Sequence, residues 1–291
     1  MKTLFHKTLI AAFLPAIALC TPTFAADPPK HSAATQHSTP AMKSMRDMRA
    51  TKLIGSDVHN SQGENLGSVK DLIIDIANDR VYYAVLSFGG FLGMGDKLFA
   101  IPVTAFRPVG SDDKVILNID NARLKGAPGF DSKSYPNFDT PQYRTEVDGY
   151  FGPNVLVKPM DNQMLRRASE WLGKNVRDRN GKEVGEVKDL VVTMGSAKIH
   201  YAVVEFDKAW SMDDKLLAVP MKALRYTTTS KDLVWDIDKS RLDAKPVFDK
   251  NKWPDINDPK TMKEIDRALI VLVPVPSAAA SGPRAAQNKQ Q

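Results

Sequence analysis

Apolar and polar residues alternate along two stretches of the chain, in the manner of half-buried strands. In residues 71–76 the side chains at positions 72, 74 and 76 are Leu or Ile, and residues 189–194 keep the same parity. Turn residues follow, Asn78-Asp79 and Gly195-Ser196, and then a second apolar stretch. The pattern predicts two β-hairpins, whose return strands cover residues 81–88 and 199–206.

Further short apolar runs follow the first hairpin, at residues 97–101, 105–108 and 114–119. Several short strands at close spacing, with no long helix among them, are typical of a small barrel or sandwich. The pattern therefore predicts an all-β protein.

The whole strand pattern occurs twice. Residues 49–141 align with residues 167–259 without a gap, at a constant offset of 118 positions (173 − 55 = 118 for Gly55 and Gly173). The shared residues include Val58/Val176, Gly63/Gly181, Gly67/Gly185, Val69-Lys70-Asp71-Leu72/Val187-Lys188-Asp189-Leu190, Tyr83-Ala84-Val85/Tyr201-Ala202-Val203, Asp96-Lys97-Leu98/Asp214-Lys215-Leu216 and Pro102/Pro220. The chain is thus an internal duplication.

A segment rich in proline and aromatic residues follows each set of strands, at residues 128–141 and 246–259. Proline disfavours helix and removes hydrogen-bond donors, so both segments are expected to be extended. We expect their aromatic side chains to cover their own strands; the alternative is an arm that docks on the sister unit or on another protein.

Two other stretches suggest short helices. Residues 262–273 could form one that packs on the second unit, and Met42–Lys52 could form a basic amphipathic lead-in that packs on the first unit. Residues 26–40 and 274–291 have the composition of disordered segments.

The order of glycines, hairpin and Asp-Lys strand in each unit resembles the PRC-barrel family. The residues that carry the resemblance are Leu53-Ile54-Gly55, Val58, Gly63, Leu66-Gly67, Val69, Asp71-Leu72, Tyr82-Tyr83-Ala84-Val85, Gly95-Asp96-Lys97 and Ile101-Pro102, with their counterparts in the second unit. The resemblance implies two tandem six-stranded β-barrels. The family includes the barrel of the photosynthetic reaction-centre H subunit and a ribosome-maturation factor, in which the barrel is an interaction platform without a catalytic motif.

The N-terminus has the layout of a secretory signal peptide, with Lys2 and Lys7 before an apolar run and cleavage predicted after Ala25. The apolar run is shorter than a membrane span of about 20 residues, so a retained anchor is the weaker interpretation. Leu19 precedes the single Cys20, which disfavours lipoprotein processing. We expect a periplasmic protein without a thiol.

These boundaries give a full domain prediction. It comprises a signal peptide (1–25), a flexible linker (26–48), a first PRC-barrel (49–146), a linker (147–166), a second PRC-barrel (167–264) and a short helix with a disordered tail (265–291). Loss of the leader lowers the formal charge from +6 to +4, with both signs interspersed. Nucleic acid is therefore not an expected partner, and any membrane-surface association is expected to be weak.

Reactive residues do not recur between the units, because His59 aligns with Arg177 and His200 aligns with Tyr82. We predict no catalytic residue, metal or cofactor, and a structural role for the acidic and basic residues that do recur. Asp71 and Asp189 in particular lie where the alternation shifts phase, as at a β-bulge.

Two matched loops carry apolar residues between turn formers, and these residues are candidate contacts to a protein partner in the envelope or to the sister barrel: Leu92, Met94, Trp210 and Met212. The expected function is a non-catalytic interaction or scaffold role. One alternative is the binding of a small anion between the barrels, by Lys97, Arg107, Arg123, Lys215, Arg225 and Arg241. The other is a membrane-anchored accessory subunit like the reaction-centre H subunit.

Overall fold

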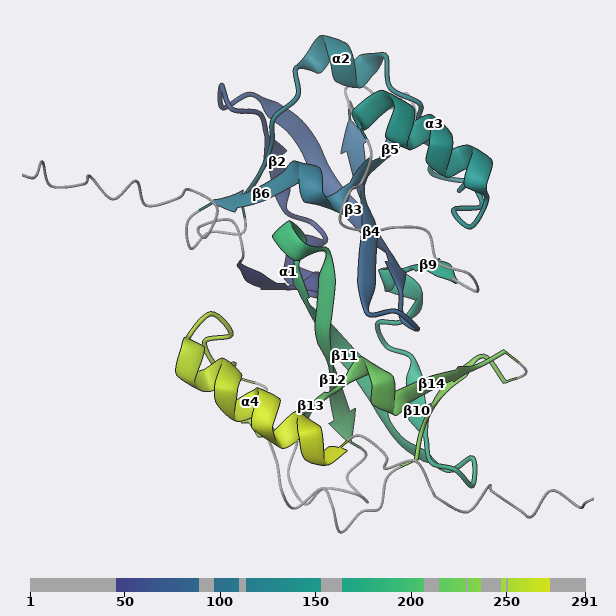
Figure 1. The fold of residues 1–291 in the computed structure, drawn as a ribbon, viewed down its shortest axis with the longest axis vertical. Helices are drawn as coiled ribbons and strands as arrows, with labels where there is room; N and C mark the ends of the chain where they lie inside the picture. The colour runs from purple at the N-terminus through teal and green to yellow at the C-terminus, as the bar shows by residue number, and fades with distance from the viewer. Residues whose placement is uncertain are drawn as a thin grey trace, which may run out of the picture. The chain divides into compact units, whose positions relative to one another are not determined.

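The computed structural model describes residues 46–88, 97–109, 114–152, 164–206, 215–228, 230–236, 247–249 and 251–272, and the fold is shown in Figure 1. Most of these residues lie in strands or helices, and strands predominate. The two aligned units are called repeat 1 and repeat 2 below.

Repeat 1 is built on a long hairpin. Its strands are β2 (Asp57–His59), β3 (Asn65–Asp75), β4 (Arg80–Phe88), β5 (Lys97–Pro102), β6 (Phe106–Val109), β7 (Lys114–Leu117) and β8 (Phe130–Asp131). β3 and β4 pair antiparallel, and the 3₁₀ turn η2 (Val103–Ala105) joins β5 to β6. The structure confirms the first predicted hairpin and its turn.

Repeat 2 has the same strands in the same order. Its strands are β10 (Asn175–Arg177), β11 (Glu183–Thr193), β12 (Lys198–Phe206), β13 (Lys215–Val219), β14 (Leu224–Thr227), β15 (Asp232–Trp235) and β16 (Val247–Asp249), with the 3₁₀ turns η4 (Met194–Ser196) and η5 (Met221–Ala223). The hairpin of β11 and β12 confirms the second predicted hairpin.

A β-bulge interrupts each hairpin at the position that the phase shift predicts. The register slips between Val69 and Asp71 in β3, and between Val187 and Asp189 in β11. Each bulge inserts one extra residue and turns the following carboxylate inward, so that Asp71 and Asp189 are buried.

The glycine that precedes each bulge lies against the neighbouring strand. A Cβ on Gly67 would lie 1.8 Å from the carbonyl oxygen of Ser87, and one on Gly185 would lie 2.1 Å from that of Glu205. Both contacts are far inside van der Waals range. Glycine is therefore required at these two positions for the close approach of the strands.

The strands that the structure describes do not close into the expected six-stranded barrels. Among the described strands, the pairing runs from β6 through β7, β2, β3 and β4 to β5, and the outer edge of β5 is taken by β8. Since β6 pairs only with β7, the sheet of repeat 1 stays open, and repeat 2 follows the same pattern from β14 to β16.

Strands predominate as predicted, but the described chain also contains helices beside the strands of both repeats. The helices are α1 (Ala50–Leu53), α2 (Asn121–Lys125), α3 (Pro141–Phe151) and α4 (Pro259–Leu272). α4 corresponds to the helix predicted at residues 262–273, whereas α3 was not expected. The equivalent prolines Pro141 and Pro259 stand at the first helical position, where a missing N–H costs nothing.

Each of these two helices packs on the strand that follows the hairpin of its own repeat, α3 on β5 and α4 on β13. In repeat 1 the ring of Phe138 lies between Tyr83 of β4 and Tyr143 of α3, with centroid distances of 6.3 and 5.5 Å. In repeat 2, Ile265 and Leu269 of α4 cover Tyr201 and Val203. The proline-aromatic segments thus lead into helices that cover their own strands.

The lead-in before repeat 1 also differs from the prediction. Residues 47–49 form a strand, β1 (Asp47–Arg49), and only the single turn of α1 is helical. β1 does not pack on repeat 1 alone, because it pairs with β11 of repeat 2. A strand forms because the exposed backbone edge of β11 supplies hydrogen-bond partners that an isolated short helix lacks.

Candidate functional site at the junction of the two repeats

The repeats exchange strands. β1, which precedes repeat 1, pairs antiparallel with β11 of repeat 2, and β9 (Leu165–Arg167), which precedes repeat 2, pairs antiparallel with β3 of repeat 1. The registers are equivalent, since Met48 opposes Val192 and Arg166 opposes Ile74. Residues 46–53 and 164–171 are called arm 1 and arm 2 below.

A buried carboxylate in each repeat holds the arm of the other. Asp189 accepts hydrogen bonds from the backbone N–H of Thr51 (3.1 Å), from the Thr51 hydroxyl and from Nε of Arg49 (2.7 Å). Asp71 accepts hydrogen bonds from the backbone N–H of Ser169 (3.1 Å) and from its hydroxyl. Thr51 and Ser169 are equivalent positions, so the two anchors repeat one design.

The environment of Asp71 opposes its charge. Burial raises the pKa of the Asp71 carboxyl above its ordinary value, and the hydrogen bonds from Ser169 and Leu72 and the positive charge of Arg167 only partly offset that shift. A buried carboxylate keeps its place when its acceptors are satisfied. The arm of the other repeat supplies the donors that do so.

Each arm also carries an arginine that stacks on an aromatic ring of the repeat it joins. The Arg49 guanidinium lies 3.6 Å from the centroid of the Trp253 ring, and that of Arg167 lies 4.9 Å from the Tyr135 ring. Trp253 and Tyr135 are equivalent and belong to the predicted proline-aromatic segments. Cation–π contacts of this kind contribute about 0.5–2 kcal/mol each.

The start of each arm is fixed by one further equivalent pair. The backbone N–H of Asp47 donates to Oδ1 of Asn257 (2.9 Å), and that of Leu165 donates to Oδ1 of Asp139 (2.7 Å). The junction therefore consists of two matched sets of contacts, one on each arm.

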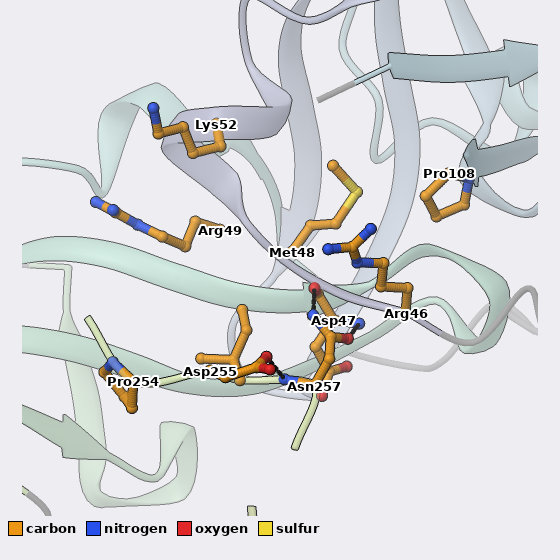
Figure 2. A pocket seen from close by; sticks show the side chains of 10 residues that line it. Arg46, Asp47, Met48, Arg49, Lys52, Pro108, Pro254, Asp255 and Asn257 are labelled. Carbon is orange, nitrogen blue, oxygen red and sulfur yellow. Dashed lines mark hydrogen bonds between the residues drawn. The ribbon is translucent and has the colours of Figure 1, made fainter. Parts of the chain in front are cut away.

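A cavity of about 210 Å³ opens beside arm 1 (Figure 2). Its walls come from arm 1, from Pro108 of β6 and from residues 254–257 of repeat 2; the lining residues are Arg46, Asp47, Met48, Arg49, Lys52, Pro108, Pro254, Asp255, Ile256 and Asn257. In the view of Figure 2, Arg46 lies on one side of Met48, and Arg49 and Lys52 lie on the other.

The predicted anion contacts are not gathered at this cavity. Lys97 donates to the carbonyl of Ala127 (3.3 Å), and a terminal nitrogen of Arg123 donates to the carbonyl of Tyr150 (3.0 Å). Arg107 is exposed on β6, and Arg225 is exposed on β14 beside a second surface hollow. These four basic residues lie on different elements, and the anion site predicted for them stays a prediction.

Several predicted contact residues lie outside the part of the chain that the structure describes. They are Leu92, Met94, Trp210, Met212 and Arg241, together with the side chain of Lys215. Their role stays a prediction.

The sequence analysis did not identify the residues that hold the arms as functional, although the sequence contains a signal for them. Arg49-Ala50-Thr51 and Arg167-Ala168-Ser169 are nearly the same tripeptide at the repeat offset, just before each repeat. The recurrence of a donor side chain at this point, with a recurring buried aspartate, is the pattern of a docking contact.

Within the described residues, no group of His, Cys, Asp and Glu side chains is arranged to hold a metal ion. No helix in the same part of the chain is long and apolar enough to cross a membrane.

The family model of the PRC-barrel domain matches the chain twice, at residues 45–124 and 164–242. Each match begins at an arm, so the matched unit includes the strand that is exchanged. No curated protein matches the chain.

Proposed function

Because the chain belongs to the PRC-barrel domain family, with two copies of the domain, we propose that it is a non-catalytic interaction module, a scaffold of the bacterial cell envelope. The proposal rests on what the two recurring carboxylates bind. Asp71 and Asp189 each bind the arm of the other repeat, so the chemistry that the repeats share serves assembly.

The junction gives such a module a defined geometry. Two arms, two buried anchors and two stacked arginines fix repeat 1 on repeat 2 from both sides. A scaffold requires surfaces held at a fixed distance, and a doubly connected junction provides that more firmly than one flexible linker does.

The surface proposed for the partner is formed by the apolar loops, with Leu92 and Met94 in repeat 1 and Trp210 and Met212 in repeat 2. Aromatic and Met side chains are enriched in the cores of protein interfaces, and two matched loops would offer a partner two contacts. Two linked contacts raise the overall affinity above that of either alone.

The envelope location rests on the N-terminal leader. N-terminal sequencing of the protein recovered from a bacterial periplasm should begin at Ala26. A sequence that begins at Met1 would instead favour a retained anchor.

The scaffold proposal is tested by crosslinking the full chain to envelope proteins and quantifying the recovered partner. The double variant L92S/W210S should lose most of the recovery, while its thermal unfolding midpoint stays within a few degrees of the wild type. Val109→Ser is the matched control, because Val109 is an exposed apolar side chain on β6, 48% accessible, outside the loops. Equal recovery by the wild type and the loop variant would contradict the proposal.

A further inference from the structure

Because the junction is approximately symmetric, the cavity beside arm 1 can be compared with the equivalent position beside arm 2. Residues 46, 49, 52 and 257 on the cavity side correspond to residues 164, 167, 170 and 139 on the other (257 − 118 = 139). The two positions share backbone and register but differ in charge.

Beside arm 2, the basic side chains are neutralised by acidic neighbours. Nε of Arg167 bonds Oε1 of Glu170 at 2.9 Å, and Nη1 of Arg166 bonds Oδ2 of Asp139 at 3.0 Å. Every cation of that arm therefore has an anion beside it.

Beside arm 1, both acidic partners are replaced. Lys52 stands where arm 2 has Glu170, and Asn257 stands where repeat 1 has Asp139. Arg49 consequently directs its Nε to the buried Asp189, and within the described parts of the chain no hydrogen bond engages its two terminal nitrogens. Arg46 and Lys52 likewise form no salt bridge with a described residue.

The two carboxylates in the wall of the cavity form hydrogen bonds with groups other than Arg46, Arg49 and Lys52. Asp47 accepts a hydrogen bond from the Thr193 hydroxyl and lies 3.2 Å from Nε2 of His200. Asp255 accepts the backbone N–H of Asn257 at 2.9 Å. Arg46, Arg49 and Lys52 thus line the cavity, and within the described parts of the chain no carboxylate of its wall forms a salt bridge with them.

We propose that this cavity binds a phosphate group, with Arg49 and Lys52 as its principal ligands and Arg46 adding positive potential. The terminal nitrogens of arginine and the ammonium of lysine are the donors that proteins use for phosphate. A volume of about 210 Å³ is below the roughly 300–1,000 Å³ of pockets for drug-sized ligands, so it suits a small anion or one headgroup. The phosphate could come from a soluble phosphate ester or from an anionic lipid headgroup.

The symmetry also supplies the decisive variant. K52E/N257D gives arm 1 the acidic partners of arm 2, so it should close the site. The new carboxylate at position 257 can still accept the N–H of Asp47, while the hydrogen bond that Nδ2 of Asn257 donates to the carbonyl of Asp47 (3.2 Å) is lost. Titration calorimetry of the full chain with inorganic phosphate and with glycerol phosphate should show saturable binding that weakens with salt, and at least about tenfold weaker binding in the variant. K182E/N180D, in the exposed turn between β10 and β11, makes the same change of charge and should bind as the wild type does.

A reciprocal variant distinguishes a specific loss of phosphate binding from a loss caused by misfolding. E170K/D139N removes the acidic partners of Arg167 and Arg166 from arm 2, where Met164 and Arg166 still stand in place of Arg46 and Met48, and it should add a second, weaker phosphate-binding event. Vesicles of phosphatidylglycerol, compared with vesicles of phosphatidylcholine, identify the source: vesicle binding that K52E/N257D removes supports a lipid headgroup, and binding of the soluble esters alone supports a soluble ligand.

Two results would overturn the inference. One is the absence of saturable heat and of selective vesicle binding in the wild type. The other is equal weakening by K52E/N257D and K182E/N180D, which would show that only net charge matters. The inference does not depend on the scaffold proposal, because a partner bound by the loops would be unaffected by these variants.

Discussion

Arg80 of β4 lies opposite Lys198 of β12, and these two residues are equivalent in the two repeats (198 − 80 = 118). The flanking hydrogen bonds are also equivalent: the N–H of Val81 donates to the carbonyl of Ala197 (3.0 Å), and the N–H of Ile199 donates to that of Asp79 (2.9 Å). A residue that pairs with its own counterpart lies at a local two-fold axis. The duplicated chain therefore has the symmetry of a dimer within one polypeptide.

The first prediction concerns cooperativity. Because each repeat contributes a strand to the other, neither should unfold while the other stays intact, and the chain should unfold in a single transition. Calorimetry checks this expectation, since the calorimetric and van't Hoff enthalpies should agree. Two resolved transitions would show that the arms contribute little.

The second prediction concerns the anchor of arm 1. Asp189→Ala should lower the free energy of unfolding by about 3 kcal/mol, because the change removes a buried acceptor of three donors from arm 1 and of the backbone N–H of Leu190. Urea unfolding measures the loss. The exposed Asp57→Ala should change the stability by no more than about 0.5 kcal/mol, and an equally small effect at Asp189 would contradict the assigned role.

The third prediction compares the effects of replacing two glycines by alanine. Gly185→Ala should destabilise the protein by about 2 kcal/mol or more, since its Cβ would meet the Glu205 carbonyl. Gly149→Ala should instead stabilise it by about 0.5–1 kcal/mol, because Gly149 is exposed within α3 and has free space around it. Chemical denaturation of both variants decides whether the signs differ.

The fourth prediction concerns alkaline pH. Burial raises the pKa values of the Tyr83 and Tyr201 hydroxyls, so the folded protein keeps them neutral at a pH where the unfolded chain, with a tyrosine pKa of about 10, ionises them. Stability should be unaffected by these groups below about pH 9 and should fall as the pH rises past 10.

The Tyr201→Phe variant tests this explanation. Removing one ionisable hydroxyl should make the fall between pH 10 and 11 shallower by up to about 1.4 kcal/mol per pH unit, as measured by urea unfolding at each pH. A slope that is the same in the variant and the wild type would exclude Tyr201 as a contributor.

The strands and the bulges could be predicted because they depend on local patterns. Period-two alternation places the hairpins, and the break in phase places the bulges at Asp71 and Asp189. The helix α3 was missed because it follows a proline-rich segment and has few apolar positions; its buried contact is Val147.

The exchange of arms could not be predicted from the pattern of residues, and the reason is the repeat itself. Arm 1 and arm 2 carry nearly the same residues, and β3 and β11 carry the same Val-Lys-Asp-Leu sequence. Each arm would therefore fit either acceptor strand with similar contacts. The distances that the connecting segments must cover decide between the pairings, and a sequence pattern does not contain them.

The reciprocal pairing of β1 with β11 and of β9 with β3 also limits how such a chain can grow or shrink. In a chain with an odd number of repeats, one arm would have to dock on its own repeat, or a strand edge and a buried aspartate would lack their partners. Bare edges of this kind promote aggregation. The exchange of arms therefore favours an even number of repeats, within one chain or between two chains.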